Sequence, residues 1–134
     1  MAWEVEGSQV KPPGLIAGGD LSAAANQYKF VKYSAAKTVI VCTGATDIPC
    51  GVLQNRPASG DAAEVVIFGI TKVQGDANLG FGDLIGTSAD GQADAKVAGT
   101  DTTEYVVGHV IEDNAAAAGL ATAFVNCVNP HRGA

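Results

Sequence analysis

The sequence predicts an all-β fold, a small β-barrel or β-sandwich of short strands that follows an extended N-terminal arm. The main observation is the segment 51–91, where short apolar runs alternate with the pairs Gly60-Asp61, Gly75-Asp76, Gly82-Asp83 and Asp90-Gly91. Gly adopts positive φ at little cost and Asp accepts hydrogen bonds from nearby backbone N–H groups, so each pair predicts a turn. Glycine is frequent, at 17 of 134 residues, and many short strands with regular turns are typical of a sandwich or barrel.

Length and composition indicate one β-rich domain, which we place at residues 28–134, after an arm at residues 1–27. The net charge of −6, with only eight Lys and Arg residues, argues against a nucleic-acid partner, because such binding depends on neutralising phosphates. No apolar stretch approaches the roughly 18 residues that a membrane span needs, so we expect no membrane partner. The opening Met1-Ala2-Trp3-Glu4 has no basic region before an apolar one, which favours synthesis in a cytoplasm.

The first 27 residues differ from the rest because they show no strand or helix periodicity. Pro12-Pro13 favours an extended, polyproline-like path. A frayed terminus is the plain alternative, but the only Trp of the chain lies here, which favours an arm that binds a partner. The candidate partner-binding residues are the apolar and proline residues of this segment: Trp3, Val5, Pro12, Pro13, Leu15 and Ile16.

Apolar and β-branched runs predict the strands of the body. We expect strands near residues 28–33, 38–42, 51–54, 63–68, 70–73, 83–85, 95–97, 105–112 and 120–128. In the last run alternation places Ala121, Ala123, Val125 and Cys127 on one face of the strand. The Ala-rich segment 114–119 fits either one helical turn or a loop.

No residue set in the sequence predicts catalysis, a cofactor or a metal site, so we do not expect an enzyme. His109 lies in an apolar run, where a structural role is favoured, and His131 lies in a tail that we expect to be loose. Regularly spaced Asp residues in Gly-rich turns could suggest calcium, but Asp in such turns usually serves the turn itself. Three cysteines, an odd number, in a chain made in a cytoplasm predict no structural disulfide.

The order of several short motifs resembles a known family. The motifs are G-V-L-Q-N (51–55), P-x-x-G-D (57–61), A-E-V (63–65), G-x-T-K-V (69–73), G-D-L-I (82–85) and V-G-H-V-I-E-D (107–113). Together they are similar to the small capsid decoration proteins of tailed bacteriophages, also called head decoration or capsid cement proteins.

This resemblance implies a β-barrel-like or β-tulip-like body and a homotrimer. It implies a place in the virion, on the outer capsid surface, after synthesis in the host cytoplasm. There the trimers would clamp neighbouring major capsid proteins and stabilise the shell, with the N-terminal arm touching the shell or an adjacent subunit. Two other classes stay open: a small ligand-binding module of the carbohydrate type, which the low aromatic content of 6% disfavours, and a small hydrolase with a Cys or His site.

Overall fold

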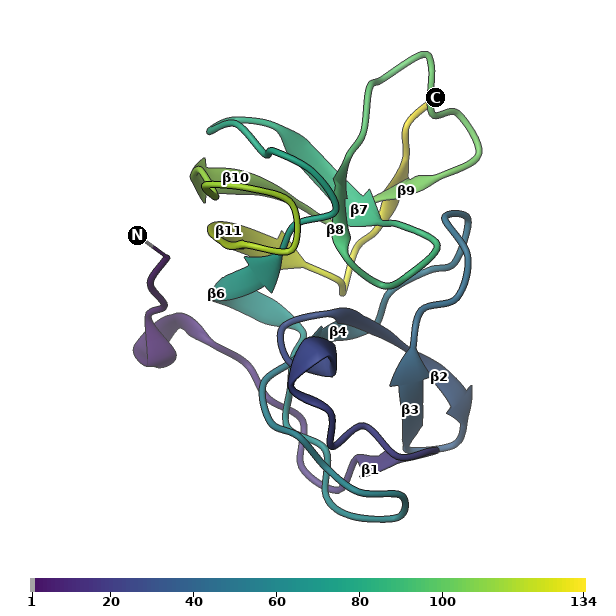
Figure 1. Cartoon of the computed structure of the whole chain (residues 1–134). Helices are drawn as coiled ribbons and strands as arrows, with labels where there is room; N and C mark the ends of the chain where they lie inside the picture. The colour runs from purple at the N-terminus through teal and green to yellow at the C-terminus, as the bar shows by residue number, and fades with distance from the viewer. Residues whose placement is uncertain (1) are drawn as a thin grey trace.

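The computed structural model describes residues 2–134 and is built almost entirely of strands (Figure 1). Within these residues the helical elements are two short 3-10 turns, η1 (Glu6–Ser8) and η2 (Ala24–Asn26). The prediction of an all-β fold is confirmed. The strands are β1 (Ile16–Ala17), β2 (Phe30–Ala35), β3 (Thr38–Val41), β4 (Gly51–Leu53), β5 (Val65–Val66), β6 (Phe68–Gln74), β7 (Leu84–Thr87), β8 (Ala93–Ala95), β9 (Tyr105–Val106), β10 (Gly108–Glu112), β11 (Leu120–Asn126) and β12 (His131–Arg132).

Two five-stranded sheets form the two halves of the molecule, one below the other in Figure 1. The first sheet has the order β1-β3-β2-β4-β5 and the second has the order β6-β11-β10-β7-β8. The second sheet curls, so that its two edge strands meet where Gly75 bridges Ala93. A separate two-stranded sheet pairs β9 with β12. The predicted architecture of short strands joined by tight turns is therefore present, as two packed and curled sheets.

The chain passes from the first sheet to the second between Val66 and Phe68, and Gly69 follows directly. Residues Val65–Val66 pair with β4, whereas Phe68–Gln74 pair with β11. Gly69 has φ +126°, and a Cβ there would lie 2.5 Å from the carbonyl oxygen of Ser8. Only glycine therefore allows both this backbone conformation and the close crossing of the N-terminal segment.

The hydrophobic core has two parts, one on each side of the first sheet. Alternation along β2 sends Phe30 into the core between the sheets and Val31 into a second cluster on the other face. The second cluster is closed by Leu15, Ala17 and Leu21 of the N-terminal segment. The first sheet is thus buried on both faces, and residues 15–21 form a layer of the body.

The strands of the body lie near their predicted positions. The predicted inward set is buried: Ala121, Ala123 and Val125 in β11, and Cys127 directly after it. The 105–112 run divides into β9 and β10, which join different sheets. The loose tail predicted around His131 is wrong, because β12 pairs with β9. His109 is exposed, because alternation in β10 turns it outward, and it stacks on Phe124; the structural role favoured for it stays a prediction.

The three cysteines are free and buried in the apolar interior. Burial raises the pKa of the Cys42 and Cys50 thiols to about 12, and it raises the pKa of Cys127 as well. These thiols therefore stay protonated at neutral pH and pack as small apolar groups.

Candidate interaction surface

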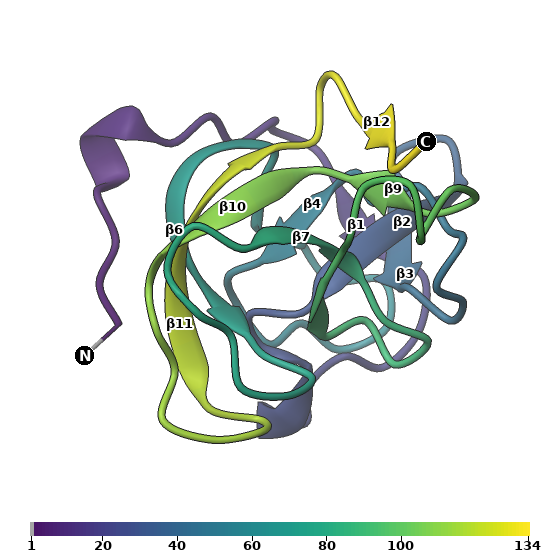
Figure 2. The same cartoon turned by 90° about the horizontal axis from the view of Figure 1, so that it is seen from above.

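The N-terminal segment, residues 2–14, lies along the β6 edge of the second sheet (Figures 1 and 2). Val10 donates its N–H to the Phe68 carbonyl at 2.9 Å and accepts from the Ile67 N–H at 3.0 Å. Further along, the Val5 N–H donates to the Ile70 carbonyl at 3.3 Å. An exposed strand edge invites unwanted pairing, and this segment covers it.

Trp3 is fastened to the outer side of the second sheet by three hydrogen bonds. Its N–H donates to the Thr122 hydroxyl at 2.6 Å, and that hydroxyl donates to the Trp3 carbonyl at 3.2 Å. The indole N–H donates to Glu112 at 2.7 Å. Trp3 and Val5 nevertheless remain 38% and 41% exposed. The segment is held by backbone and side-chain hydrogen bonds, while its apolar side chains stay partly exposed.

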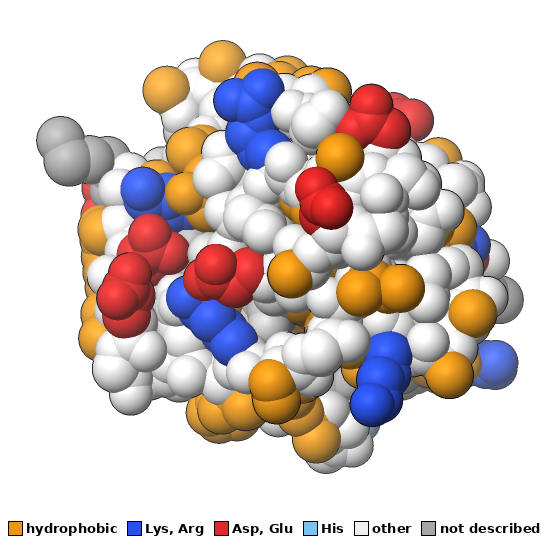
Figure 3. Space-filling view, turned by 90° about the horizontal axis from the view of Figure 1, so that it is seen from below, with side chains coloured by type: hydrophobic (Ala, Val, Ile, Leu, Met, Phe, Trp, Pro, Cys, Tyr) orange, Lys and Arg blue, Asp and Glu red, His pale blue; other side chains and the backbone are white. Residues whose placement is uncertain are grey.

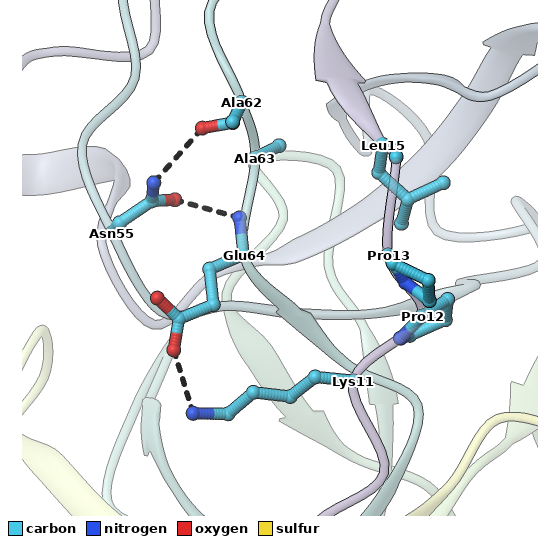
Figure 4. A pocket seen from close by; sticks show the side chains of 9 residues that line it. Lys11, Pro12, Pro13, Leu15, Asn55, Ala62, Ala63 and Glu64 are labelled. Atoms are coloured by element: carbon cyan, nitrogen blue, oxygen red, sulfur yellow. Dashed lines mark hydrogen bonds and ion pairs between the residues drawn. The ribbon is translucent and has the colours of Figure 1, made fainter.

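Pro12 and Pro13 form one wall of a shallow hollow of about 330 Å³ where the segment crosses to the first sheet (Figure 4). Lys11 reaches across this hollow to Glu64, with Nζ 2.6 Å from the carboxylate. On the opposite wall Asn55 accepts from the Glu64 N–H at 2.9 Å and donates to the Ala62 carbonyl at 3.0 Å. The polar groups of the hollow satisfy one another, so it serves to anchor the segment.

The last two candidate partner-binding residues are Leu15, directly before β1, and Ile16, the first residue of β1, and they differ in burial. Leu15 is only 5% exposed and belongs to the second core cluster, so it is not available to a partner. Ile16 is 41% exposed and begins β1, a strand that pairs in parallel with β3. The six candidates thus follow one continuous path over the molecule without gathering into one site.

A second exposed surface, which we call the aromatic face, consists of Phe68, Leu84, His109 and Phe124 on the outer side of the second sheet. The Phe68 and Phe124 rings meet edge to face, with centroids 5.1 Å apart. His109 stacks on Phe124 at 5.9 Å. Phe68 and Leu84 are 37% and 42% exposed. The alternation in residues 120–128 already turns Phe124 outward, but β6, β7 and β10 supply the other three residues, and their pairing is visible only in the structure.

A groove of about 250 Å³ runs beside the aromatic face and is lined by residues of β7, β9, β10, β11 and β12. Asn126 lies in this lining, and its Oδ1 atom is buried without a hydrogen-bond partner among the described residues. A buried acceptor without a donor is costly, so this oxygen is a locally unfavourable feature of the groove wall.

The charged side chains do not form a field of one sign over the face that carries β1, where acidic, basic and hydrophobic groups are interspersed (Figure 3). Within residues 2–134 no group of three His, Cys, Asp or Glu side chains is placed to hold a metal ion. In the same range no helix is long and apolar enough to span a membrane. The surface features that the structure does offer are apolar and are suited to contact with another macromolecule.

The fold is similar to that of a solved bacteriophage protein. The N base of the head fiber gp8.5 of bacteriophage phi29 superposes with a TM-score of 0.62 at 20% sequence identity. The match covers 84% of this chain and 91% of that chain. No family model and no curated protein sequence matches the chain.

Proposed function

We propose that this protein is a structural protein of a bacteriophage virion. It binds the outer surface of the capsid and stabilises the shell by clamping neighbouring major capsid proteins, and it does so as a homotrimer. The single observation that carries the proposal is the fold shared with the base of a phage head fiber over most of both chains. The motif order between residues 51 and 113, which resembles capsid decoration proteins, supports it independently.

The surface chemistry agrees with a binding protein of this kind. Five exposed apolar residues lie on the N-terminal segment and the aromatic face: Trp3, Val5, Val10, Phe68 and Leu84, each between 37% and 49% exposed. Fully burying an exposed apolar side chain contributes about 1.5–3 kcal/mol, so burying the exposed two fifths contributes about 0.6–1.2 kcal/mol each. The five together supply about 3–6 kcal/mol.

This small binding free energy per copy is the reason to expect that the protein acts as a self-associated unit. Association costs about 4–15 kcal/mol in lost translational and rotational freedom, so one copy bound through these residues alone would hold weakly. Three linked copies bind with a much higher effective concentration, because each copy keeps the others near their sites. A trimer thus turns a weak contact per chain into stable attachment.

The test is co-sedimentation of the purified protein with expanded capsids of the phage that encodes it, prepared without this protein. We expect saturable binding and a higher temperature of capsid disruption. Light scattering on the free protein measures its own association state. A protein that stays in the supernatant at every capsid concentration would refute the proposal.

The role of the N-terminal segment in capsid binding is tested by a truncation that leaves the folded body intact. Removing residues 2–19 would delete Leu15 and Ala17 and open the second core cluster. Removing residues 2–10 takes away exposed and half-buried side chains, none of which belongs to either core cluster, and the cover of the β6 edge. We expect this shorter truncation to fold and to bind capsids more weakly. Undiminished binding would show that the segment only protects its own sheet.

A carbohydrate-type ligand is the second candidate function, and one observation favours it. Phe124 and His109 stack on each other in the lining of a groove that also holds the polar residues Asn126 and Asn129. The C–H face of a sugar ring packs on aromatic rings, and its hydroxyls hydrogen-bond to polar side chains. A glycan array separates the two candidates. Saturable binding of one glycan, together with no capsid binding, would favour the second.

A further inference from the structure

Two loops at one end of the second sheet are fastened into a single unit, which we call the loop pair: residues 75–83 and residues 113–119 (Figure 2). The buried Asn114 side chain joins them, accepting from the Leu79 N–H at 2.8 Å and donating to the Ala77 carbonyl at 3.0 Å. The Gly75 N–H also donates to the Gly119 carbonyl at 3.0 Å. Gly75 is required because a Cβ there would lie 2.3 Å from the Asn114 amide nitrogen.

The loop pair presents Phe81 at its tip. Phe81 is 77% exposed, the highest value among the large hydrophobic residues that the structure describes. Its N–H donates to Asp113 at 2.7 Å, and the next N–H, of Gly82, donates to the Val110 carbonyl at 2.7 Å. The tip is thus held by backbone bonds, while the ring makes little contact with the body. An aromatic group fixed in position before binding lowers the entropic cost of association.

The charges around Phe81 are all of one sign. The loop pair contains Asp76, Asp83 and Asp113 and no Lys or Arg. An anionic surface, such as nucleic acid or acidic lipid, would be repelled by these carboxylates. A second copy docked symmetrically through the same loops would bring like charges together. The surface that complements this tip is an apolar pocket with basic residues on its rim.

We propose that Phe81 is an anchor that enters an apolar pocket rimmed by Lys and Arg side chains on the capsid shell. The inference rests on the proposed capsid-binding function and adds the point of contact and its chemistry. Aromatic residues that fill a pocket at the centre of an interface dominate many binding energies, whereas charges on the rim mainly set the association rate and the salt dependence.

The first experiment compares Phe81→Ser with Tyr33→Ser in capsid co-sedimentation. Tyr33 is the matched control, because it is another exposed aromatic residue, at 54%, on β2 in the other sheet. We expect Phe81→Ser to weaken binding at least about tenfold and Tyr33→Ser to leave it unchanged. Thermal unfolding should remain near wild type for Phe81→Ser, since its ring makes few contacts.

The second experiment tests the charge of the rim. Asp76→Lys is compared with Asp61→Lys. Asp61 is the matched control because it also follows a glycine in a turn, but that turn lies beside the first sheet. We expect Asp76→Lys to weaken binding severalfold at about 0.05 M salt and to approach the wild type near 1 M, where charges are screened within about 3 Å. The Asp61→Lys variant should follow the wild type throughout.

The outcomes separate this inference from the proposed function. If the wild type binds capsids and Phe81→Ser binds equally well, the inference is wrong and the proposed function stands. If Phe81→Ser changes the association state of the free protein and leaves capsid binding unchanged, the occupant is a second copy and the inference is wrong. If the wild type does not bind capsids, both fail.

Discussion

Replacing Leu15 by Ala tests whether the N-terminal segment is part of the folded body. Leu15 is 5% exposed and closes the second core cluster, whereas the adjacent Ile16 is 41% exposed. Truncating a buried Leu costs about 2–5 kcal/mol, because apolar contact is lost and a cavity remains. The control, Ile16→Ala, should cost about 1 kcal/mol or less, which is usual for partly exposed positions.

The two variants are compared by urea and thermal unfolding followed by circular dichroism. For a domain of this length about 1 kcal/mol shifts the midpoint by roughly 3–4 °C, so Leu15→Ala should melt about 6–20 °C below the wild type. A Leu15→Ala variant that is no less stable than Ile16→Ala would refute the reasoning. The segment would then be a separate arm, as its sequence suggests.

Three further predictions concern stability and the thiols. Lys96→Ala should cost about 3 kcal/mol or more in urea unfolding, because it leaves the Glu104 carboxylate without its buried cation; a cost below 1 kcal/mol would contradict this. Burial alone would raise the pKa of Asp47, but the hydrogen bond from Lys32, helped by backbone N–H groups, lowers it. Asp47 therefore adds stability above its unfolded pKa of about 3.9, and the increment is lost as pH falls through the lower folded pKa. Asp47→Asn should thus lose less stability than the wild type between about pH 5 and pH 2, and equal losses would count against the ion pair. The three cysteines should all be alkylated in denaturant without reductant, as read by intact mass; a stoichiometric bridge would disprove the expectation of free thiols.

Part of the second sheet could be predicted from alternation, although Thr122, on the outward side of β11, is also buried. The inward set of β11 follows directly from the two-residue period. The turn pairs were also informative, since Gly60, Gly82 and Gly91 all have positive φ. Gly75 is different, because the close approach of Asn114 requires it. The same Gly-Asp pattern therefore has two physical causes that the sequence does not distinguish.

The N-terminal segment could not be placed from its sequence, because distant residues determine its burial. Leu15 packs in a cluster with residues of β2, β3, β4 and β5, and Val10 pairs with Phe68. Contacts that involve only one or two residues of a segment leave no periodic hydrophobic pattern in its sequence. The Ala-rich segment 114–119 is a loop. A helix here would need the Asn114 side chain as its N-terminal cap, but that side chain accepts from the Leu79 N–H of the neighbouring loop.

The candidate surface was predictable only in part. The sequence indicated exposed apolar residues near the N-terminus, and Trp3 and Val5 are exposed there. The aromatic face needs the pairing of β6, β11, β10 and β7, which single strands do not specify. Phe81 lies between two glycines in the sequence, and its exposure depends on the capped loop that holds it.

The most direct test of the account is a cryo-electron microscopy reconstruction of expanded capsids incubated with this protein, compared with capsids alone. The account predicts added density on the outer surface, in groups of three copies, with each copy touching more than one major capsid protein. Capsids without added density, or density confined to the inner surface or the tail, would contradict it.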